Sequence, residues 1–383
     1  MYSSSTIELS KSALKHNIKF LRSLIDDSTI FTSVVKSNAY GHGIEDIVPV
    51  MEECGVASFA VFSASEAIRV KSSLKQNKTI IILGYIPDEL IDWVIDNEIE
   101  CYISDSVRAN SLMLASKRLN KKAIVHLDLE TGMNRTGLNF NDLQEALSII
   151  KGNRENFHIR GVCTHFAGAE SISNYVRIQN QFKLYKELVD YLKKEGIKPD
   201  LLHTACSAAA ITYPETRLDM VRIGIMQYGF WSSNETFIHY IHDKTNKKDP
   251  LRRVLQWKSK IMDVKYVKQG EFVGYGNFFQ AHKDMKIAII PVGYYNGYSR
   301  SLSNQGKVLI YNQRVSVIGM VNMNMIVGDV SKLKDVKIGD EVVIIGKQGK
   351  NQLSVASFSE LSNQVNYELL TRLPQDINRI QIK

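Results

Sequence analysis

The chain has 383 residues, of which 44% are hydrophobic and 23% are charged, and its formal net charge is +8. This composition is typical of a globular protein with room for two domains, and it excludes a largely disordered chain. Because no stretch holds 18 uninterrupted apolar residues and no apolar run follows a basic start, we expect neither a membrane-spanning helix nor a signal peptide.

Apolar, β-rich runs alternate with amphipathic stretches through the first 240 residues. Eight such runs occur, at 31–36, 56–62, 79–83, 100–103, 123–129, 158–164, 201–205 and 220–223. Between them, apolar residues recur at helical spacing, for example at Ile178, Phe182 and Tyr185. Parallel strands need helical crossovers, and eight strand–helix units are the number in a TIM-type (β/α)8 barrel. The pattern therefore predicts a barrel domain over residues 1–240.

The pattern changes after residue 250, where short β-rich runs follow one another with few helical stretches between them. These runs lie at 255–267, 285–292, 307–310, 315–320, 325–329 and 341–345, and turn signals join them. One helix is expected, near residues 355–364. A charged segment, 243–253, precedes the change, and we interpret it as a solvated linker. The sequence therefore predicts an α/β protein whose second domain, 241–383, is mostly antiparallel β.

Neither the positive charge nor the cysteines indicate a nucleic-acid or metal site. The lysines are dispersed, and the densest basic cluster, 243–253, contains acidic residues and no aromatic ones, unlike a patch that binds phosphates. The cysteines lack the paired spacing of metal ligands, so we expect reduced thiols in the cytoplasm. They are Cys54, Cys101, Cys163 and Cys206.

One lysine ends the first of these runs. Residues 31–35 are mostly apolar or β-branched and lead to Lys36, and glycines follow at 41 and 43. A lysine held at a rigid strand end and partly desolvated loses its proton more readily, because burial disfavours the ammonium form. Such an amine can form a Schiff base with a carbonyl cofactor. The alternative is a lysine that extends from the strand end into water.

Polar residues follow the ends of several other predicted strands. Because the active site of a (β/α)8 barrel lies at the C-terminal ends of its strands, we expect these residues to meet on one rim. They are Asp128, Glu130 and Arg135 after the fifth strand, His165 after the sixth, Cys206 and Ser207 after the seventh, and Arg222 at the eighth. The sequence therefore predicts an active site at the rim that includes Lys36.

The segment VVKSNAYGHG at 34–43 closely resembles the cofactor-lysine motif of bacterial alanine racemases, which bind pyridoxal phosphate (PLP). Five further motifs match this family in the same order along nearly the whole chain. They are HLDLETGMNR at 126–135, THF at 164–166, HTACS at 203–207, VRIGI at 221–225 and PVGYYNGY at 291–298. The resemblance implies a barrel that carries PLP, a C-terminal β domain and a head-to-tail homodimer that acts on a small amino acid.

The resemblance implies which residues hold the cofactor. Lys36 is similar to the lysine that bonds to PLP, His165 to the histidine that packs against the pyridine ring, and Arg222 to the arginine that faces the ring nitrogen. The residues that match phosphate ligands are Tyr40, Ser207, Tyr367 and, through their backbone, Gly224 and Ile225. Without the resemblance, His165 would be interpreted as a capping histidine and Arg222 as a surface arginine.

The resemblance also implies a proton acceptor on each face of the substrate's α-carbon. Lys36 would serve one face, and Tyr294 of the partner subunit would serve the other. A free tyrosine has a pKa of about 10, so this function needs a nearby positive charge, and His203 matches the histidine expected beside it. Arg135 and the backbone amide of Met323 match groups that bind the substrate carboxylate, and Arg135 would also bind the phenolic oxygen of the cofactor.

Several positions depart from the family pattern. Relatives often carry a carbamylated lysine where this chain has Asp128, which we expect to orient Arg135 directly or through a water molecule. Cys206 replaces an asparagine at a helix start, where a thiol should be reactive, and Asn324 replaces an aspartate beside Met323. The other replacements are Glu130 and Asn296 for aspartates and Tyr295 for an alanine. Because Asn324 adjoins a substrate contact, substrate choice is the least constrained expectation.

We therefore expect PLP-dependent racemisation of alanine in the cytoplasm, which would supply D-alanine for peptidoglycan precursors. Racemisation of serine or of a broader set of small amino acids is the alternative. A PLP-dependent decarboxylase is disfavoured because the Gly-rich phosphate loop of such enzymes is absent. A non-enzymatic PLP carrier is disfavoured because such carriers resemble the barrel alone. No metal, nucleic acid or membrane partner is expected.

Overall fold

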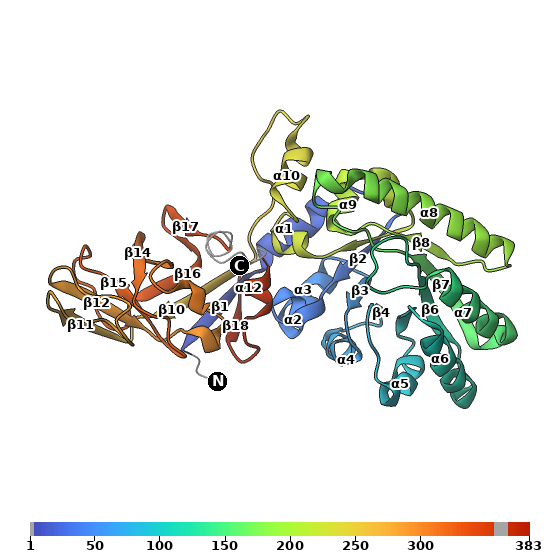
Figure 1. Cartoon of the computed structure of the whole chain (residues 1–383), viewed down its shortest axis with the longest axis horizontal. Coiled ribbons are helices and arrows are strands. Elements are labelled where there is room, and N and C mark those ends of the chain that lie inside the picture. The colour runs from blue at the N-terminus through green and yellow to red at the C-terminus, as the bar shows by residue number, and fades with distance from the viewer. Residues whose placement is uncertain (1–3, 356–366) are drawn as a thin grey trace. The chain divides into compact units, whose positions relative to one another are not determined.

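The computed structural model describes residues 4–355 and 367–383, and Figure 1 shows the arrangement of their helices and strands. The helix that the sequence predicts near residues 355–364 therefore lies almost entirely outside the described residues. Among the described helices, none is long and apolar enough to cross a membrane.

The chain folds into two compact units, each built from more than one segment. The first, which we call the barrel unit, consists of Ala13–Ser37 and Ile47–Arg252. The second, the β unit, consists of Met1–Ser12, Asn38–Asp46 and Arg253–Lys383. A single division after residue 240 does not describe these units, because two segments from the first 50 residues belong to the β unit.

Eight parallel strands form the sheet of the barrel unit, and they lie where the sequence predicts them. They are β2 (Ile30–Val34), β3 (Ser58–Val61), β4 (Thr79–Ile82), β5 (Glu100–Ile103), β6 (Ala123–Asp128), β7 (Phe157–Cys163), β8 (Leu201–His203) and β9 (Met220–Ile223). From β2 to β8 each strand pairs with the next, and β9 pairs with β2, where Arg222 lies opposite Thr32. A bridge between Cys206 and Arg222 joins the segment after β8 to β9 and closes the ring. The predicted TIM-type barrel fold is confirmed.

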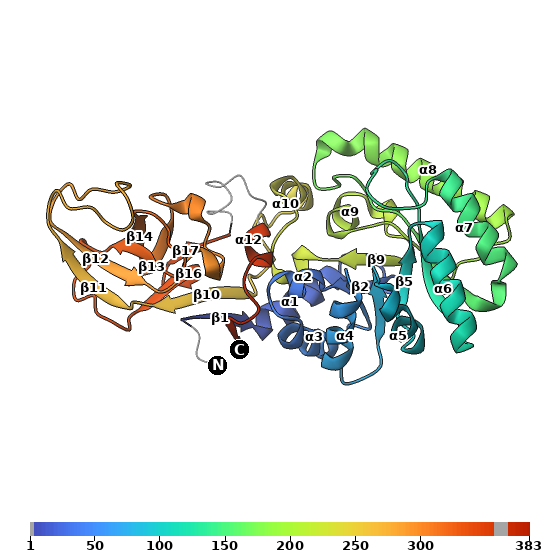
Figure 2. The same cartoon turned by 60° about the horizontal axis from the view of Figure 1, so that its bottom comes forward.

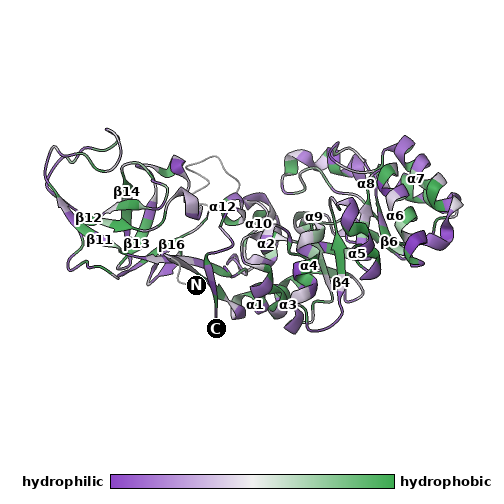
Figure 3. Ribbon diagram, turned by 90° about the horizontal axis from the view of Figure 1, so that it is seen from below, coloured by the Kyte–Doolittle hydropathy of each residue, from purple (hydrophilic) through white to green (hydrophobic). Residues whose placement is uncertain are grey.

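Helices connect successive strands and surround the sheet (Figures 1 and 2). They include α3 (Ile44–Glu53), α4 (Ala64–Ser73), α5 (Ile91–Asp96), α6 (Ser106–Leu119), α7 (Phe140–Gly152), α8 (Tyr175–Lys194) and α9 (Ser207–Thr212). Side-chain caps fix several starts, because an oxygen at the N-cap accepts an otherwise unpaired N–H. The Asp105 carboxylate, for example, accepts from the Arg108 N–H at 2.7 Å. Figure 3 shows hydrophilic and hydrophobic residues on the same helices, as expected of helices that cover a sheet.

The barrel contains buried polar side chains beside its apolar core. In β6, Val125 and Leu127 are fully buried, and so is His126 between them. Successive side chains of a strand point to opposite faces, so His126 faces away from its two apolar neighbours. His203 is also fully buried, and Arg222 is 6% exposed. Burying such groups is costly unless they find partners, and these three do so within the barrel unit.

The β unit contains one sheet in the order β11-β12-β15-β14-β13-β16-β10-β1-β18, with β17 paired to β16. Its strands are β1 (Ser5–Ser10), β10 (Leu255–Lys260), β11 (Asp263–Val267), β12 (Met285–Ile290), β13 (Lys307–Ile310), β14 (Gln313–Ile318), β15 (Ile326–Asp329), β16 (Glu341–Gln348), β17 (Asn351–Leu353) and β18 (Asn378–Ile382). Among the described strands of this unit, only β1 and β18 pair in parallel. The expected mostly antiparallel domain is confirmed, and it includes a short helix, α12 (Glu368–Thr371).

Several details of the β unit differ from the sequence expectations, which do not include β1, β17 or β18. The run 255–267 is two strands, because β10 pairs with β1 and β16 whereas β11 pairs with β12. Strand β1 lies outside the predicted elements, although Ser5, Ile7 and Leu9 are buried and alternate with partly exposed residues. It pairs with β10 and β18, and this explains why the first residues of the chain belong to the β unit rather than to the barrel.

Candidate active site

The predicted rim residues of the barrel unit lie at the C-terminal ends of their strands. Lys36 follows β2, Asp128 is the last residue of β6, and His165 follows β7 by two residues. Ser207 begins α9 after β8, and Arg222 lies near the end of β9. The fold therefore carries all five to the rim where (β/α)8 barrels hold their active sites.

Four side chains at the rim interact electrostatically: Lys36, Arg135, His165 and Arg222. The pKa of His165 is lowered to about 3, first by burial and then by Arg222, Arg135 and Lys36. Burial lowers the pKa of Lys36, and Arg135 lowers it further, whereas Glu66 raises it. His165 is therefore neutral at physiological pH, and the Lys36 amine loses its proton more readily than a free lysine. A nucleophilic lysine needs this state.

The backbone that leads to Lys36 is fixed inside the barrel unit. The Val35 N–H donates to the Ala60 carbonyl at 2.8 Å, which continues the pairing of β2 with β3. The Val34 carbonyl accepts from Gln227 Nε2 at 2.9 Å. The backbone of Lys36 is thus attached to a rigid strand end, and this restricts the positions that its amine can reach.

A left-handed helical turn follows Lys36. The short helix α2 (Lys36–Tyr40) has φ between +53° and +54° at its last four residues, and a left-handed residue other than glycine costs roughly 1–2 kcal/mol. Within the β unit, His42 Nδ1 lies 3.0 Å from the carbonyl oxygens of both Ala39 and Tyr40. Burial lowers the pKa of His42 to about 4, so the ring is neutral and its one N–H is shared by these two acceptors. Strained backbone held in this way is typical of functional sites.

Residues from the end of the β unit hold the same turn. A Cβ at Gly41 would lie 1.8 Å from the Leu370 carbonyl oxygen, so only glycine fits there. Arg379 donates to the Gly41 carbonyl from Nε and Nη2, at 3.2 and 2.9 Å. The rings of Tyr40 and Tyr367 lie 6.1 Å apart at 75°. The structure therefore brings together the two tyrosines that the sequence predicts as phosphate ligands.

The loops after β8 and β9 lie side by side at Ser207 and Gly224. The Gly224 N–H donates to Ser207 Oγ at 2.8 Å. Ser207 begins α9, and Gly224 precedes the 3-10 helix η5 (Ile225–Tyr228). Two helix starts therefore meet where (β/α)8 barrels usually bind phosphate, and the N–H groups of helix starts attract anions.

Arg222 is held by four hydrogen bonds inside the barrel unit. Nη1 donates to Nδ1 and to the carbonyl of His203. Nη2 donates to the carbonyls of Thr164 at 2.8 Å and Thr204 at 2.9 Å. Among the described residues, no side chain or carbonyl accepts from its Nε–H. Because an arginine keeps its protons at any working pH, this Nε–H is a donor available to a ligand.

Asp128 and Arg135 do not meet directly, contrary to one of the two arrangements expected. Asp128 Oδ2 accepts from Thr136 Oγ1 at 3.3 Å, and within the described part of the chain no hydrogen bond or ion pair joins it to Arg135. The aspartate is short and buried, whereas Arg135 is exposed. Burial raises the pKa of Asp128 to about 6, and the charges of Arg222 and Arg135 lower it. The two groups therefore interact through space.

Glu130 shapes the loop that carries Arg135. Its carboxylate accepts from the backbone N–H groups of Gly132, Met133 and Asn134, at 2.7 Å for Met133 and 2.8 Å for Asn134. From the sequence, Glu130 is expected at the rim and as a replacement for an aspartate, but these backbone contacts are not. The sequence does contain a sign of these contacts, because a carboxylate just before a glycine-containing loop can accept from the N–H groups of that loop.

His203 has partners at both ring nitrogens inside the barrel unit. Nδ1 accepts from Arg222 Nη1, and Nε2 lies 2.9 Å from Nδ1 of His126. Both ring nitrogens of His203 are therefore engaged by other residues of the barrel unit. The expected place of His203 beside Tyr294 of the partner subunit stays a prediction.

Tyr294, Met323 and Asn324 are exposed residues of the β unit. The Tyr294 N–H donates to the Asn322 carbonyl at 3.0 Å. A Cβ at Gly293 would lie 2.2 Å from the same carbonyl oxygen, so glycine is required for this close approach. The structure therefore holds Tyr294 against the loop that carries Met323 and Asn324.

Two family models match the chain and together span most of it. The model of the alanine racemase N-terminal domain matches residues 9–231, and that of the C-terminal domain matches residues 254–381. The chain belongs to the alanine racemase family. The resemblance drawn from the motifs is thereby confirmed, and the protein is an amino acid racemase, an isomerase.

Individual alanine racemases resemble the chain over nearly its whole length. The alanine racemase of Leptospira interrogans is 33% identical over 383 residues, which cover 99% of this chain and 96% of the relative. The solved alanine racemase of Bacillus anthracis with bound L-Ala-P is 26% identical with a TM-score of 0.91, covering 100% and 96% of the two chains. The solved alanine racemase of Bartonella henselae with covalently bound pyridoxal phosphate is 25% identical with a TM-score of 0.83, covering 100% of both chains.

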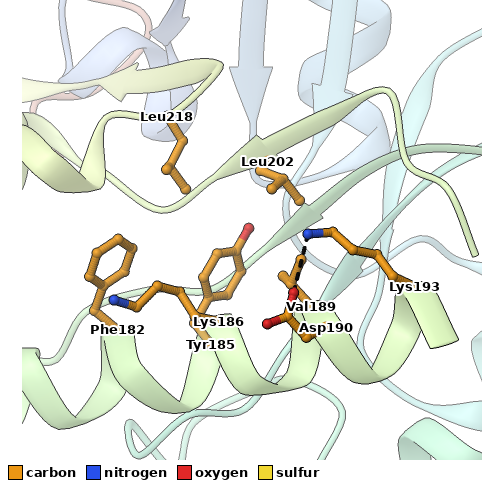
Figure 4. A pocket seen from close by; sticks show the side chains of 8 residues that line it. All are labelled: Phe182, Tyr185, Lys186, Val189, Asp190, Lys193, Leu202 and Leu218. Carbon is orange, nitrogen blue, oxygen red and sulfur yellow. Dashed lines mark hydrogen bonds and ion pairs between the residues drawn. The ribbon is translucent and has the colours of Figure 1, made fainter.

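A cavity of about 220 Å³ lies elsewhere on the barrel unit of this racemase (Figure 4). Its walls come from α8, from β8 and from the turn before β9, and they include Tyr185, Leu202 and Leu218. The ammonium of Lys186 lies 4.7 Å from the centre of the Phe182 ring beside it. None of the predicted site residues lines this cavity, so we do not assign it to the active site of the racemase.

Proposed function

We propose that this racemase acts on alanine with PLP bonded to Lys36, on the rim of the barrel unit. The observation that carries the proposal is the electrostatic cluster at Lys36, which sets an amine with a lowered pKa among Arg135, His165 and Arg222. The relative from Bartonella henselae with covalently bound pyridoxal phosphate supports the choice of cofactor.

The residues present fit PLP. A pyridine nitrogen needs a donor, and the Arg222 Nε–H has no other partner among the described residues. A phosphate needs several donors, which the Ser207 hydroxyl and the Ile225 N–H offer at two helix starts. The Gly224 N–H, which donates to Ser207 Oγ, would be shared with the phosphate. We propose the hydroxyls of Tyr40 and Tyr367 as further phosphate ligands and the neutral ring of His165 as the group that packs against the pyridine ring. The ligands of the proposed phosphate site and the ring site are therefore all present in this chain.

The chemistry follows from the fixed proton of Arg222. When bound, PLP withdraws electrons from the α-carbon of an amino acid and makes its proton removable. Arg222 donates a hydrogen bond but cannot protonate a ring nitrogen. An arginine at that position therefore favours return of the proton to the same carbon, which is racemisation, over its transfer to another atom.

Two proton acceptors are needed, one on each face of the α-carbon. We propose Lys36 Nζ for one face and the hydroxyl of Tyr294 of the partner subunit for the other, in a head-to-tail homodimer. Tyr294 is 41% exposed and the neighbouring Met323 is 55% exposed, which leaves both available to a second chain. Because His203 is occupied within the barrel unit, the positive charge that a basic tyrosine needs must come from another group.

Arg135 and the backbone amide of Met323 are the proposed ligands of the substrate carboxylate. Arg135 is exposed and makes no hydrogen bond to another described residue, so its fork is free to hold a carboxylate. The proposed product, D-alanine, would enter peptidoglycan precursors in the cytoplasm. Serine or a broader set of small amino acids is the second candidate, because Asn324 replaces an acidic residue beside Met323.

Chiral chromatography of the products from a panel of L-amino acids tests the proposal. The purified protein, supplied with PLP, should convert L-alanine to D-alanine and D-alanine to L-alanine, and alanine should be the fastest substrate. Faster conversion of serine would replace alanine by the second candidate. If the protein forms the opposite enantiomer of no small amino acid in the panel, the proposed function is contradicted.

A further inference from the structure

Four buried side chains form a hydrogen-bonded chain through the barrel, which we call the interior relay: Arg222, His203, His126 and Glu100. Arg222 Nη1 contacts His203 Nδ1, His203 Nε2 lies 2.9 Å from His126 Nδ1, and His126 Nε2 lies 2.7 Å from Glu100 Oε2. Both histidines are 0% exposed and Glu100 is 7% exposed. The reaction proposed above uses only the first member, so the other three need an explanation.

The relay admits one arrangement of protons when the histidines are neutral. An arginine only donates, so His203 Nδ1 must accept and its proton must lie on Nε2. His203 then donates to His126 Nδ1, which places the proton of His126 on Nε2, facing the Glu100 carboxylate. Burial lowers the pKa of both histidines, and Arg222 lowers that of His203 further. Both rings are therefore neutral.

The barrel makes room for the relay. A Cβ at position 161 would lie 2.1 Å from His126 Nδ1, so Gly161 on the neighbouring strand leaves the space that the imidazole fills. The register between β6 and β7 also shifts between Val125 and His126. The ring of Tyr102 lies 5.7 Å from that of His126 and 6.2 Å from that of His203. The histidines are thus fixed by packing as well as by hydrogen bonds.

Outside the relay, Glu100 is followed by a positive side chain, Arg160, and then by a negative one, Asp200. Arg160 Nε lies 3.5 Å from Glu100 Oε1, and Arg160 Nη1 lies 2.9 Å from Asp200 Oδ2. The buried Arg222 and Glu100 are therefore compensated without any proton transfer. Because Arg222 does not release a proton, the relay cannot conduct one from its inner end. Its directed hydrogen bonds suit orientation instead.

We infer that Glu100 and His126 are positioning residues for Arg222. Glu100 holds the proton of His126 on Nε2, His126 thereby holds that of His203 on Nε2, and His203 presents a lone pair to Arg222. The other tautomer of His203 would set an N–H against the N–H of Arg222 and displace the guanidinium. This inference rests on the proposed function, because that function depends on where the Arg222 donor lies.

Nitrogen-15 NMR of histidine-labelled protein, recorded with and without PLP, tests the proton arrangement. Spectra of His126→Asn and His203→Asn assign the two signals. We expect both rings to be neutral and protonated at Nε2 in the unaltered protein, and Glu100→Leu to mix the tautomers. A proton on Nδ1 of either ring, or unchanged tautomers in Glu100→Leu, would overturn the inference. The tautomers are read without the cofactor, so failure to bind PLP would count against the proposed function only.

Activity and the absorption spectrum of the PLP-loaded enzyme test the consequence for Arg222. Glu100→Leu removes the acceptor, and Gly161→Ala pushes a Cβ against His126. We expect each to lower kcat about tenfold, the size found when an outer hydrogen-bond partner is lost, to change the cofactor absorption and to leave KM nearly unchanged. The matched control Asp200→Asn weakens the outer pair of Arg160 and the contact of Asp200 with His158. It touches neither histidine of the relay and should resemble the unaltered enzyme.

A folded Glu100→Leu enzyme with unchanged kcat and absorption would overturn the inference. If Glu100→Leu does not fold, Gly161→Ala and Glu100→Gln decide. The glutamine keeps an acceptor oxygen and should preserve the tautomers and most of kcat, whereas Gly161→Ala should not. Equal kcat and equal spectra for these two variants would then overturn the inference.

Discussion

Arg379, in β18, donates two hydrogen bonds to the carbonyl oxygen of Gly41, from Nε at 3.2 Å and from Nη2 at 2.9 Å. The same guanidinium donates to the carbonyls of Pro374, Gln375 and Ile377. Gly41 directly follows the left-handed turn after the proposed cofactor lysine. One arginine of the last strand therefore ties that turn to the end of the β unit.

Replacing Arg379 should loosen the turn without unfolding the barrel unit. We expect Arg379→Ala to weaken PLP binding by about tenfold, because hydrogen bonds to a charged group contribute roughly 1.5–3 kcal/mol. Fluorescence titration with PLP measures this change. Arg314→Ala, which removes an exposed arginine bonded to the Gln352 carbonyl in the same unit, is the control and should bind PLP normally. An unchanged affinity of Arg379→Ala for PLP would show that cofactor binding does not depend on the hydrogen bonds between Arg379 and Gly41.

Mixed dimers test whether the active site is shared between subunits. Lys36→Ala and Tyr294→Phe should each nearly abolish racemisation, since each removes one of two proton acceptors. In a dimer with one chain of each kind, one site combines an intact Lys36 with an intact Tyr294. Co-expression should therefore restore activity, up to one working site per mixed dimer. Mixed dimers that form, as checked by two affinity tags, but stay inactive would place both acceptors in one chain.

Asp128 should make stability depend on pH. Its pKa is raised from 3.8 to about 6 by burial, so between these values the folded protein binds more protons at this site than the unfolded chain does. The free energy of unfolding should therefore fall as pH rises through this window, by roughly 3 kcal/mol in total. Asp128→Asn cannot ionise and should lack this fall. Urea unfolding at several pH values measures it, and identical pH profiles for the two proteins would contradict the assignment.

The same substitution should lower activity while PLP stays bound. The Asp128 carboxylate acts on Arg135 through space, and a bridging water molecule is compatible with the absence of a direct bond. We expect Asp128→Asn to reduce kcat by about ten- to a hundredfold. The unaltered enzyme should not need bicarbonate, because an aspartate carries its carboxyl group without carbamylation. Activity that rises with added bicarbonate, or full activity in Asp128→Asn, would refute this account.

Cys206 should report on the proposed phosphate site. It is half-buried and directly precedes Ser207, whereas Cys101 and Cys163 are buried. Alkylation should inactivate the enzyme, and bound PLP should slow both inactivation and labelling, which mass spectrometry can follow. Because Cys54 is also half-buried, the experiment uses a Cys54→Ser background, in which Cys206→Ala should resist the reagent. Labelling at the same rate with and without PLP would place Cys206 outside the site.

The barrel could be predicted because buried parallel strands have continuous apolar runs. Strand β4, for example, reads Thr-Ile-Ile-Ile and is buried at all three isoleucines. Strands β1 and β18 could not be predicted in the same way. They pair in parallel, with Thr6 opposite Asn378, and a local pattern contains no information about a partner at the other end of the chain.

Much of the candidate site followed from the ends of strands. In a barrel, position along the strand decides which rim a residue reaches, and this located Lys36, His165 and Arg222. The interior relay could not be predicted, because Glu100 begins one apolar run, His126 lies inside another, and their pairing depends on which strands adjoin. For the same reason, the partners of His203 became known only from the structure.

The central claim is that Lys36 carries PLP, and borohydride reduction followed by peptide mapping tests it most directly. Reduction converts a reversible bond between the cofactor and a lysine into a permanent one. The purified protein supplied with PLP should be yellow, and reduction should fix the cofactor on a peptide that contains Lys36. Cofactor fixed on another lysine, or no cofactor fixed on any peptide, would contradict the account.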